Sequence, residues 1–373
     1  MRNVYTMKNL ANGAKNPFTR RQWLALTGGM MAGTTLTGCL SGQPSSDPQL
    51  TNVSYDPTRE FYEAYNVAFA QYWKQQYGKT PNVKMSHGGS GRQARAVMDG
   101  ILADVVTLAL AFDIDMIAEK TGLIDADWRN RFPHHASPYQ STIVFMVRKG
   151  NPKEIRRWED LIRDDVEVIT PHPKTSGAAR YNFLAAWGYI LKRELGDFTV
   201  LAEKNSPQVK EAERVAEDFI GKMYRNVPVL DSGARGSTMT FTRNQIGDVL
   251  LNWENEAFLA IREDGGDELE IVVPPWSILA EPPVAVVDQV AQRHGTTQIA
   301  HAYLEYLYSV EGQTLAAKHG YRPSQPELVD PNILEGVTTP ELFSVDEVFG
   351  GWKQAQERFF NDNGVFDRIF QPG

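Results

Sequence analysis

Small residues and hydroxyl groups follow five of the predicted β-strands in this sequence. The segments are Asp56-Pro57-Thr58, His87-Gly88-Gly89-Ser90-Gly91, Lys174-Thr175-Ser176-Gly177-Ala178, Asp231-Ser232-Gly233-Ala234-Arg235-Gly236-Ser237 and Asn252-Trp253-Glu254-Asn255. Gly and Ser at the start of a helix let the backbone approach a ligand while its unpaired N–H groups and the positive end of the helix dipole face it. One such turn is an ordinary helix cap, but several that converge would form a pocket made only of donors. That pocket would suit a small oxyanion that has no proton to donate.

Motifs of the common enzyme classes are not found. Gly88-Gly89-Ser90-Gly91-Arg92 lacks the last Gly of a nucleophile elbow, and no Walker A loop or G-x-G-x-x-G after a strand is present. The seven histidines do not have the H-E-x-x-H spacing of a zinc protease. We therefore expect no catalytic residue, metal or cofactor. A secreted ester hydrolase that uses Ser90 or Ser176 as nucleophile is the alternative from a different class.

Short β-rich segments alternate with longer helical patterns from about residue 50 onward. Strands are predicted over residues 51–55, 82–86, 104–110, 142–149, 167–170, 227–230, 248–253, 270–273 and 284–287. Helices are predicted over residues 57–77, 93–102, 178–194, 209–224, 297–308, 311–318 and 346–360. The alternation predicts an α/β protein with mainly parallel sheets. Ligands of such sheets bind beyond the carboxyl ends of the strands, where the five small-residue segments lie.

Composition limits the choice of function. The chain has 373 residues, enough for about two domains, and 42% of them are hydrophobic and 23% charged, as in soluble globular proteins. The net charge is −8, with 38 basic and 46 acidic residues, which argues against nucleic acid as a partner. A single cysteine excludes a disulfide framework.

The first 38 residues contain five basic residues and no acidic one. A short apolar run over residues 24–38 follows the pair Arg20-Arg21, too short to span a bilayer, which takes about 20 helical residues. Residues 1–38 are therefore predicted to be a signal peptide, which resembles a twin-arginine export signal, with an ordinary basic leader as the alternative. Without them, 33 basic residues face 46 acidic ones, a net charge of −13.

The only cysteine lies at the end of this leader. Leu36-Thr37-Gly38-Cys39 resembles a bacterial lipobox, in which cleavage precedes the cysteine and its sulfur receives a lipid; an incidental cysteine is the alternative. We expect Cys39 to be the lipid attachment site and residues 39–49 to be a tether. The mature chain would then lie in the periplasm or on the outer face of the cytoplasmic membrane, and its only contact with the membrane would be the lipid.

Six blocks of the sequence resemble one known family. They are residues 52–60, 86–91, 173–180, 231–237, 253–257 and 349–352, which read NVSYDPTRE, SHGGSG, PKTSGAAR, DSGARGS, WENEA and FGGW. In this order they are similar to the prokaryotic sulfate-binding proteins, the solute receptors of sulfate/thiosulfate ABC importers. The similarity extends from about residue 50 to residue 366.

The resemblance implies a type II periplasmic-binding-protein fold with two α/β lobes joined by crossover hinge segments. Residues 50–140 and 284–373 would form lobe 1 and residues 141–283 lobe 2, with crossovers near residues 141–145 and 278–284. In this family neutral donors hold a dehydrated sulfate without a salt bridge. Carried over by motif, the donors are the backbone N–H groups of Asp56, Gly177, Ala178 and Ala234, a donor of Ser90, the Ser176 hydroxyl and the Trp253 indole.

Two positions depart from the family pattern. His172 stands where Asn is usual, and Ala178 where Gly is usual; a backbone donor survives the second change if φ stays negative. The resemblance implies a monomeric receptor, not an enzyme, that delivers sulfate to ABC permease subunits. A thiosulfate- or molybdate-preferring receptor of the same fold is the alternative.

Overall fold

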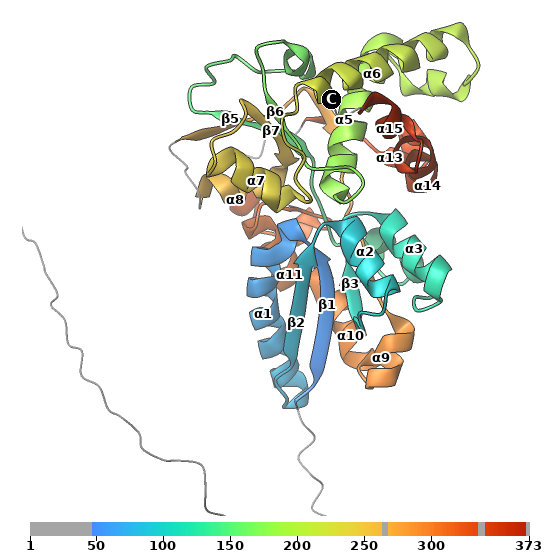
Figure 1. The fold of residues 1–373 in the computed structure, drawn as a ribbon. Helices are drawn as coiled ribbons and strands as arrows, with labels where there is room; N and C mark the ends of the chain where they lie inside the picture. The colour runs from blue at the N-terminus through green and yellow to red at the C-terminus, as the bar shows by residue number, and fades with distance from the viewer. Residues whose placement is uncertain (1–46, 263–267, 335–339, 371–373) are drawn as a thin grey trace, which may run out of the picture. The chain divides into compact units, whose positions relative to one another are not determined.

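The computed structural model describes residues 47–262, 268–334 and 340–370. They form two lobes, each built on a four-stranded sheet with helices around it (Figure 1). The predicted signal peptide, Cys39 and all but the end of the predicted tether lie outside these ranges. Among the helices in these ranges, none combines the length and hydropathy needed for a membrane span.

The first lobe contains the sheet β10-β3-β1-β2. Its strands are β1 (Gln49–Tyr55), β2 (Asn82–Gly88), β3 (Val105–Thr107) and β10 (Val284–Val286). Its helices are α1 (Arg59–Tyr77), α2 (Ser90–Met98), α3 (Ala111–Thr121), α9 (Asp288–His294), α10 (Thr297–Glu305) and α11 (Val310–Lys318). β1, β2 and β3 are parallel, and Tyr55 lies opposite Gly88, so β1 and β2 end side by side. Helix α1 lies on one side of this sheet and α2 and α3 on the other (Figure 1).

The second lobe contains the sheet β6-β7-β5-β8. Its strands are β5 (Ile143–Arg148), β6 (Val168–Ile169), β7 (Val249–Trp253) and β8 (Leu269–Val272). Only β6 and β7 are parallel, while β5 runs antiparallel to both β7 and β8. The expectation of mainly parallel sheets is therefore wrong for this lobe.

The strand predicted over residues 227–230 does not form. The Val168 N–H donates to the Asn226 carbonyl and the His172 N–H to the Asp231 carbonyl, with N–O distances of 2.8 Å each. This segment is thus bonded to the β6 region at its two ends and does not build a continuous ladder. The turn that follows it nevertheless leads into a helix, as expected.

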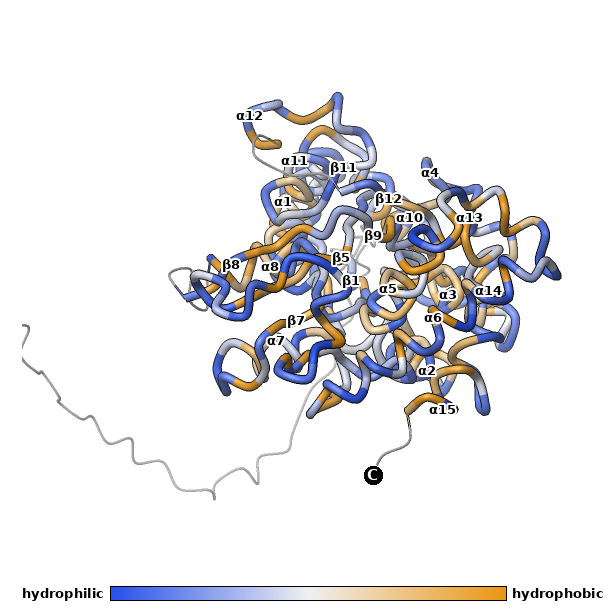
Figure 2. The backbone as a smooth tube through the Cα atoms, turned by 90° about the horizontal axis from the view of Figure 1, so that it is seen from above, coloured by the Kyte–Doolittle hydropathy of each residue, from blue (hydrophilic) through white to orange (hydrophobic). Residues whose placement is uncertain are grey.

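The second lobe contains four α-helices between residues 177 and 260, two of which begin at serine caps. They are α5 (Gly177–Leu195), α6 (Pro207–Arg225), α7 (Ala234–Thr242) and α8 (Glu254–Ala260). The hydroxyls of Ser176 and Ser206 accept from the backbone N–H groups of Ala179 and Val209, which caps α5 and α6. α5 is almost entirely buried, and β7 beside it is marked by an orange, hydrophobic stretch of the tube (Figure 2).

The C-terminal segment packs on the second lobe, although the sequence division placed residues 284–373 in lobe 1. It contains α13 (Val345–Phe349), α14 (Trp352–Ala355), the π-helical turn Gln356–Phe360 and α15 (Val365–Ile369). Phe359 contacts Phe183 and Trp187 of α5 at centroid distances of 5.4 and 4.8 Å. Burial of these aromatic rings gives the segment its place, because each fully buried large apolar side chain contributes about 1.5–3 kcal/mol.

Short elements lie where the chain crosses between the lobes. They are β4 (Tyr139–Gln140) paired with β11 (Arg322–Pro323), β9 (Trp276–Ile278) paired with β12 (Glu341–Phe343), and α12 (Pro331–Leu334). Ser141 and Ala280 form an isolated antiparallel bridge in which each N–H donates to the other's carbonyl at 2.9 Å. The two crossover segments are therefore hydrogen-bonded to each other.

Candidate anion-binding pocket

A small pocket lies where the two lobes meet, with a cavity volume of about 10 Å³. It is lined by Tyr55, Asp56, Pro57, Gly88, Gly89, Ser90, Ala109, Ser176, Gly177, Ala178 and Ala234. We call it the interlobe pocket. Sites for drug-sized organic ligands occupy about 300–1,000 Å³. The interlobe pocket is thus sized for an inorganic ion or a very small molecule.

Four helical segments begin at this pocket. The 3₁₀ turn Asp56–Thr58, which continues into α1, begins at Asp56, and α2, α5 and α7 begin at Ser90, Gly177 and Ala234. The first N–H groups of a helix have no partner within it, and the helix dipole adds a positive partial charge at that end. Four converging N-termini therefore present backbone donors and positive potential without any cationic side chain.

The register of the sheets explains this convergence. β1 and β2 are paired along their whole length, so Asp56 and Gly89 follow directly at one edge. On the other lobe, the Ser176 N–H donates to the His172 carbonyl at 3.0 Å, which fixes the turn before α5. The turn before α7 ends at Gly233, in extended conformation.

The two serines at the pocket have different roles. The Ser90 hydroxyl donates to Asp113 and accepts from the Ala109 N–H at 3.0 Å, so its donor is already used. The Ser176 hydroxyl accepts from the Ala179 N–H at 3.4 Å and keeps its own proton for another partner. The donor that Ser90 can offer a ligand is therefore its backbone N–H at the start of α2, and the hydroxyl donor is that of Ser176.

Trp253 is the one predicted donor that does not line the pocket as defined above. Its indole is buried at the end of β7, and the Nε1–H has no hydrogen-bond partner among the described residues. The ring contacts Tyr55, a lining residue, at a centroid distance of 5.4 Å and Tyr181 at 5.2 Å. A buried N–H without a partner costs about 1–3 kcal/mol, so a ligand that accepts from it would repay that cost.

Two cationic side chains near the pocket, Arg180 and Lys174, are paired with carboxylates. Arg180 pairs with Asp113 at 3.3 Å, and both side chains are at most 5% exposed. Lys174 pairs with Asp367 at 2.9 Å. Neither of these two cations lines the pocket, whose wall at the helix starts is backbone.

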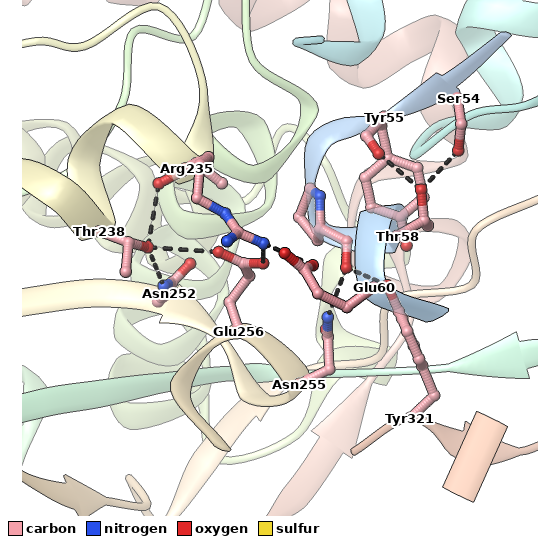
Figure 3. A network of polar contacts seen from close by, with 12 residues as sticks. Ser54, Tyr55, Thr58, Glu60, Arg235, Thr238, Asn252, Asn255, Glu256 and Tyr321 are labelled. Atoms are coloured by element: carbon pink, nitrogen blue, oxygen red, sulfur yellow. Dashed lines mark hydrogen bonds and ion pairs between the residues drawn. The ribbon is translucent and has the colours of Figure 1, made fainter. Parts of the chain in front are cut away.

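Arg235 is the centre of a polar network beside the pocket (Figure 3). Its guanidinium donates to Glu60 of α1 at 2.7 Å and to Glu256 of α8 at 3.0 Å, so it joins the two lobes. The Asn255 side chain of the second lobe and the Tyr321 hydroxyl of the first both donate to the Pro57 carbonyl, at 3.4 and 2.9 Å. This network holds the Asp56–Thr58 turn and the start of α7 near each other.

Burial shifts the pKa values of acidic groups and of one histidine near the pocket. Burial raises the pKa of Glu256 to about 7 against the opposing effect of Arg235. Burial also raises the pKa of Asp56, which Arg59, Arg92 and Arg235 oppose. Burial, followed by Arg59, lowers the pKa of His87 to about 4, so this imidazole is neutral at pH 7.

His172 does not line the pocket. Its Nδ1 accepts from the Lys174 N–H at 3.1 Å, and its ring contacts Phe366 and Phe370. Burial and then Lys174 lower its pKa. In the ranges that the structure describes, no cluster of three or more His, Cys, Asp or Glu side chains could hold a metal ion.

Tyr55 and Ala109 also line the pocket and were not predicted as site residues. Nor did the sequence indicate Asp113 and Glu60, which pair with arginines 67 and 175 residues away. The only local signal was the position of Tyr55 directly before Asp56. The pairings themselves depend on contacts between the lobes and leave no pattern in the sequence.

Comparison with known proteins gives one family. The family model described as "Bacterial extracellular solute-binding protein" matches residues 58–322. The chain is 55% identical over 325 residues to a sulfate-binding protein of Escherichia coli (strain K12), which covers 87% of this chain and 94% of that protein. It is 47% identical over 333 residues to a thiosulfate-binding protein of Pseudomonas aeruginosa, which covers 89% and 95%.

Solved structures show the same fold. The sulfate-binding protein SubI from Mycobacterium tuberculosis H37Rv superimposes with a TM-score of 0.71 at 29% identity and covers 84% of this chain and 100% of that one. A periplasmic thiamin binding protein superimposes with a TM-score of 0.61 at 15% identity, covering 90% and 100%, a likeness of fold alone. The two-lobed type II architecture predicted from the sequence is confirmed.

Proposed function

Because the chain belongs to the family of bacterial extracellular solute-binding proteins, we propose that it captures sulfate in the interlobe pocket and delivers it to an ABC permease. The observation that carries the proposal is the convergence of four helical N-termini on one small pocket. The proposal is of binding without catalysis, and it is supported by the bonding of Ser90 to a carboxylate and of both Ser90 and Ser176 to backbone N–H groups rather than to a histidine base.

Neutral donors bind the anion. They are the backbone N–H groups of Asp56, Ser90, Gly177, Ala178 and Ala234, the Ser176 hydroxyl and the Trp253 indole. The overall charge of −13 in the mature chain does not prevent this, because surface charges are screened beyond about 10 Å whereas donors in a dry pocket are not. Helix dipoles supply the positive potential that Arg180 and Arg235, bound to carboxylates, do not.

Such a pocket selects against phosphate. At neutral pH phosphate retains a proton that needs an acceptor, whereas sulfate has none. A pocket that offers only donors leaves this proton unpaired, at a cost of about 1–3 kcal/mol, or roughly fivefold to more than a hundredfold in affinity.

Closure of the two lobes would bury the anion. The crossovers near residues 141–145 and 278–284 are the expected hinges, and the Ser141–Ala280 bridge supports their acting together. Export by the signal peptide over residues 1–38 and lipid attachment at Cys39 would place a monomeric receptor in the periplasm, tethered to the membrane surface.

Thiosulfate is the second candidate ligand, because a thiosulfate-binding protein is 47% identical to this chain. Calorimetric titration with sulfate, thiosulfate, molybdate and phosphate between pH 6 and 8 distinguishes the candidates. We expect sulfate to bind at least fivefold more tightly than phosphate. Stronger binding of thiosulfate would identify the second candidate, and equal binding of phosphate would contradict a pocket of donors alone.

A further inference from the structure

Three glycines near the pocket lie so close to the opposite lobe that a Cβ atom added to each would come within 2.7 Å of it. A Cβ atom on Gly89 of the first lobe would lie 2.5 Å from the Thr175 carbonyl oxygen and 3.0 Å from that of Ser232. A Cβ on Gly233 of the second lobe would collide with the Asp56 carboxylate, and one on Gly177 would lie 2.7 Å from the Ala109 Cβ. Each of these contacts joins the first lobe to the second. A side chain at any of the three positions would therefore meet the opposite lobe.

The backbone of Gly89 and Gly233 does not itself require glycine. Gly89 has φ −58° and ψ 132°, and Gly233 has φ −162° and ψ 168°. Both conformations are ordinary for any L-residue. The physical reason for glycine at these two positions is thus the approach of the other lobe rather than the local turn.

We infer that the lack of a side chain at Gly89 and Gly233 allows the two lobes to close on the ligand. This inference rests on the proposed function, in which closure brings the four helical N-termini around sulfate. A methyl group at either position would act as a wedge in the closed form, whereas in an open form it would face solvent. Since the apparent affinity falls with the fraction of closed, binding-competent protein, the wedge weakens binding without removing a donor.

The two positions differ in how well the wedge is tolerated. The atoms opposite Gly89 are backbone carbonyl oxygens of Thr175 and Ser232, which cannot move without displacing the start of α5 and the turn before α7. The atom opposite Gly233 belongs to the Asp56 side chain, which can rotate. Gly89→Ala is therefore the stronger wedge. Gly177 is left unchanged in the test because its N–H is itself a proposed donor.

Two glycines serve as controls. A Cβ on Gly88 would be 3.4 Å from Arg92 and Gln93 of its own lobe, an ordinary contact. A Cβ on Gly221, in α6, would meet nothing within 4 Å. Gly88→Ala tests the same substitution in the same loop, and Gly221→Ala tests it far from the pocket.

The experiment combines calorimetric titration with sulfate, small-angle scattering with and without saturating sulfate, and thermal unfolding without ligand. We expect Gly89→Ala to weaken sulfate binding at least thirtyfold and to lose the contraction seen on addition of sulfate. Gly233→Ala should weaken sulfate binding about threefold to tenfold. Gly88→Ala should weaken it less than Gly89→Ala does, and Gly221→Ala should weaken it less than twofold. Without sulfate, the unfolding temperatures of Gly89→Ala and Gly233→Ala should stay within about 3 °C of the wild type.

Three results overturn the inference. The first is that the Gly89→Ala variant binds sulfate within threefold of the wild-type affinity and contracts on addition of sulfate as the wild type does. The second is Gly88→Ala that loses as much affinity as Gly89→Ala. The third is an unfolding temperature of ligand-free Gly89→Ala well below the wild-type value, which would make the glycine a folding requirement. A wild-type protein that binds neither sulfate nor thiosulfate would instead overturn the proposed function itself.

Discussion

The indole of Trp253 lies against the ring of Tyr55 with their centroids 5.4 Å apart, and the indole N–H has no hydrogen-bond partner among the described residues. Both side chains are buried, Tyr55 at the end of β1 and Trp253 at the end of β7. The pair thus joins the carboxyl ends of two strands, one from each lobe. Unpaired buried donors are rare in folded proteins and point to a ligand that accepts from them.

Trp253→Phe tests the indole donor. The variant keeps a ring that can contact Tyr55 and Tyr181 but removes the Nε1–H. In calorimetric titration we expect sulfate affinity to fall about tenfold, because the variant loses one hydrogen bond to a charged group. Sulfate should also change the fluorescence of the wild-type protein, and this change should shrink in the variant. Full affinity in Trp253→Phe would remove the indole from the donors.

Ser176→Ala and Ser90→Ala separate the two hydroxyls. Ser176→Ala removes a free donor and the cap of α5, so it should weaken sulfate binding at least tenfold and lower the free energy of unfolding by about 0.5–2 kcal/mol. Ser90→Ala removes a partner of Asp113 but leaves its own backbone N–H, so stability should fall while affinity falls less than in Ser176→Ala. Calorimetric titration measures the sulfate affinity of each variant, and urea denaturation measures its free energy of unfolding. The reverse order of affinities would contradict these assignments.

Breaking the Arg180–Asp113 pair tests its role as a buried contact between lobes. Arg180→Met leaves the Asp113 carboxylate buried without its cation, and removal of one partner of a buried pair costs about 3–5 kcal/mol. The double variant Asp113→Asn with Arg180→Met should regain part of this loss, as measured by urea denaturation. If the double variant loses the full sum of the single changes, the two side chains do not interact energetically.

His87 should make the fold sensitive to acid. Its pKa is lowered from 6.5 to about 4 by burial, so its contribution to stability is present above pH 6.5 and is lost as the pH falls toward 4. His87→Gln removes this titration. The free energy of unfolding of the wild type relative to the variant should therefore fall on acidification from pH 6.5 to 4, by at most about 1.4 kcal/mol per pH unit.

Glu256 gives the opposite control for that experiment. Its pKa is raised from 4.5 to about 7, so its contribution is present below pH 4.5 and is lost as the pH rises through 7. The stability of the wild type relative to Glu256→Gln should thus fall between pH 4.5 and 8. A wild type whose stability relative to either variant does not change with pH would show that the group concerned is not buried as the structure has it.

Local sequence signals were sufficient to predict the turns of the candidate site, but not the direction of every strand or the side-chain pairs between the lobes. The turns at Asp56, Ser90 and Ser176 were predictable because a strand, small residues and a helix follow one another within a few positions. At Ala234 the small residues and the helix are present, although the strand predicted before them does not form. The antiparallel β5 was not predictable, because strand direction depends on the crossovers between lobes rather than on hydropathy. Two arginine pairs, Arg235–Glu60 and Arg180–Asp113, likewise join segments far apart in sequence. The Ser90 hydroxyl donates to Asp113, a partner that the sequence around Ser90 does not indicate.

In the proposed complex, backbone and neutral side-chain donors, not cationic side chains, hold the anion in the interlobe pocket. A crystal structure with selenate, an isosteric dianion with a strong anomalous signal, tests this arrangement directly. We predict one anomalous peak in the pocket, with oxygens about 2.7–3.2 Å from the N–H groups of Gly177, Ala178 and Ala234. A selenate held by a guanidinium or by the Lys174 ammonium, with the pocket amides out of hydrogen-bond range, would contradict the account.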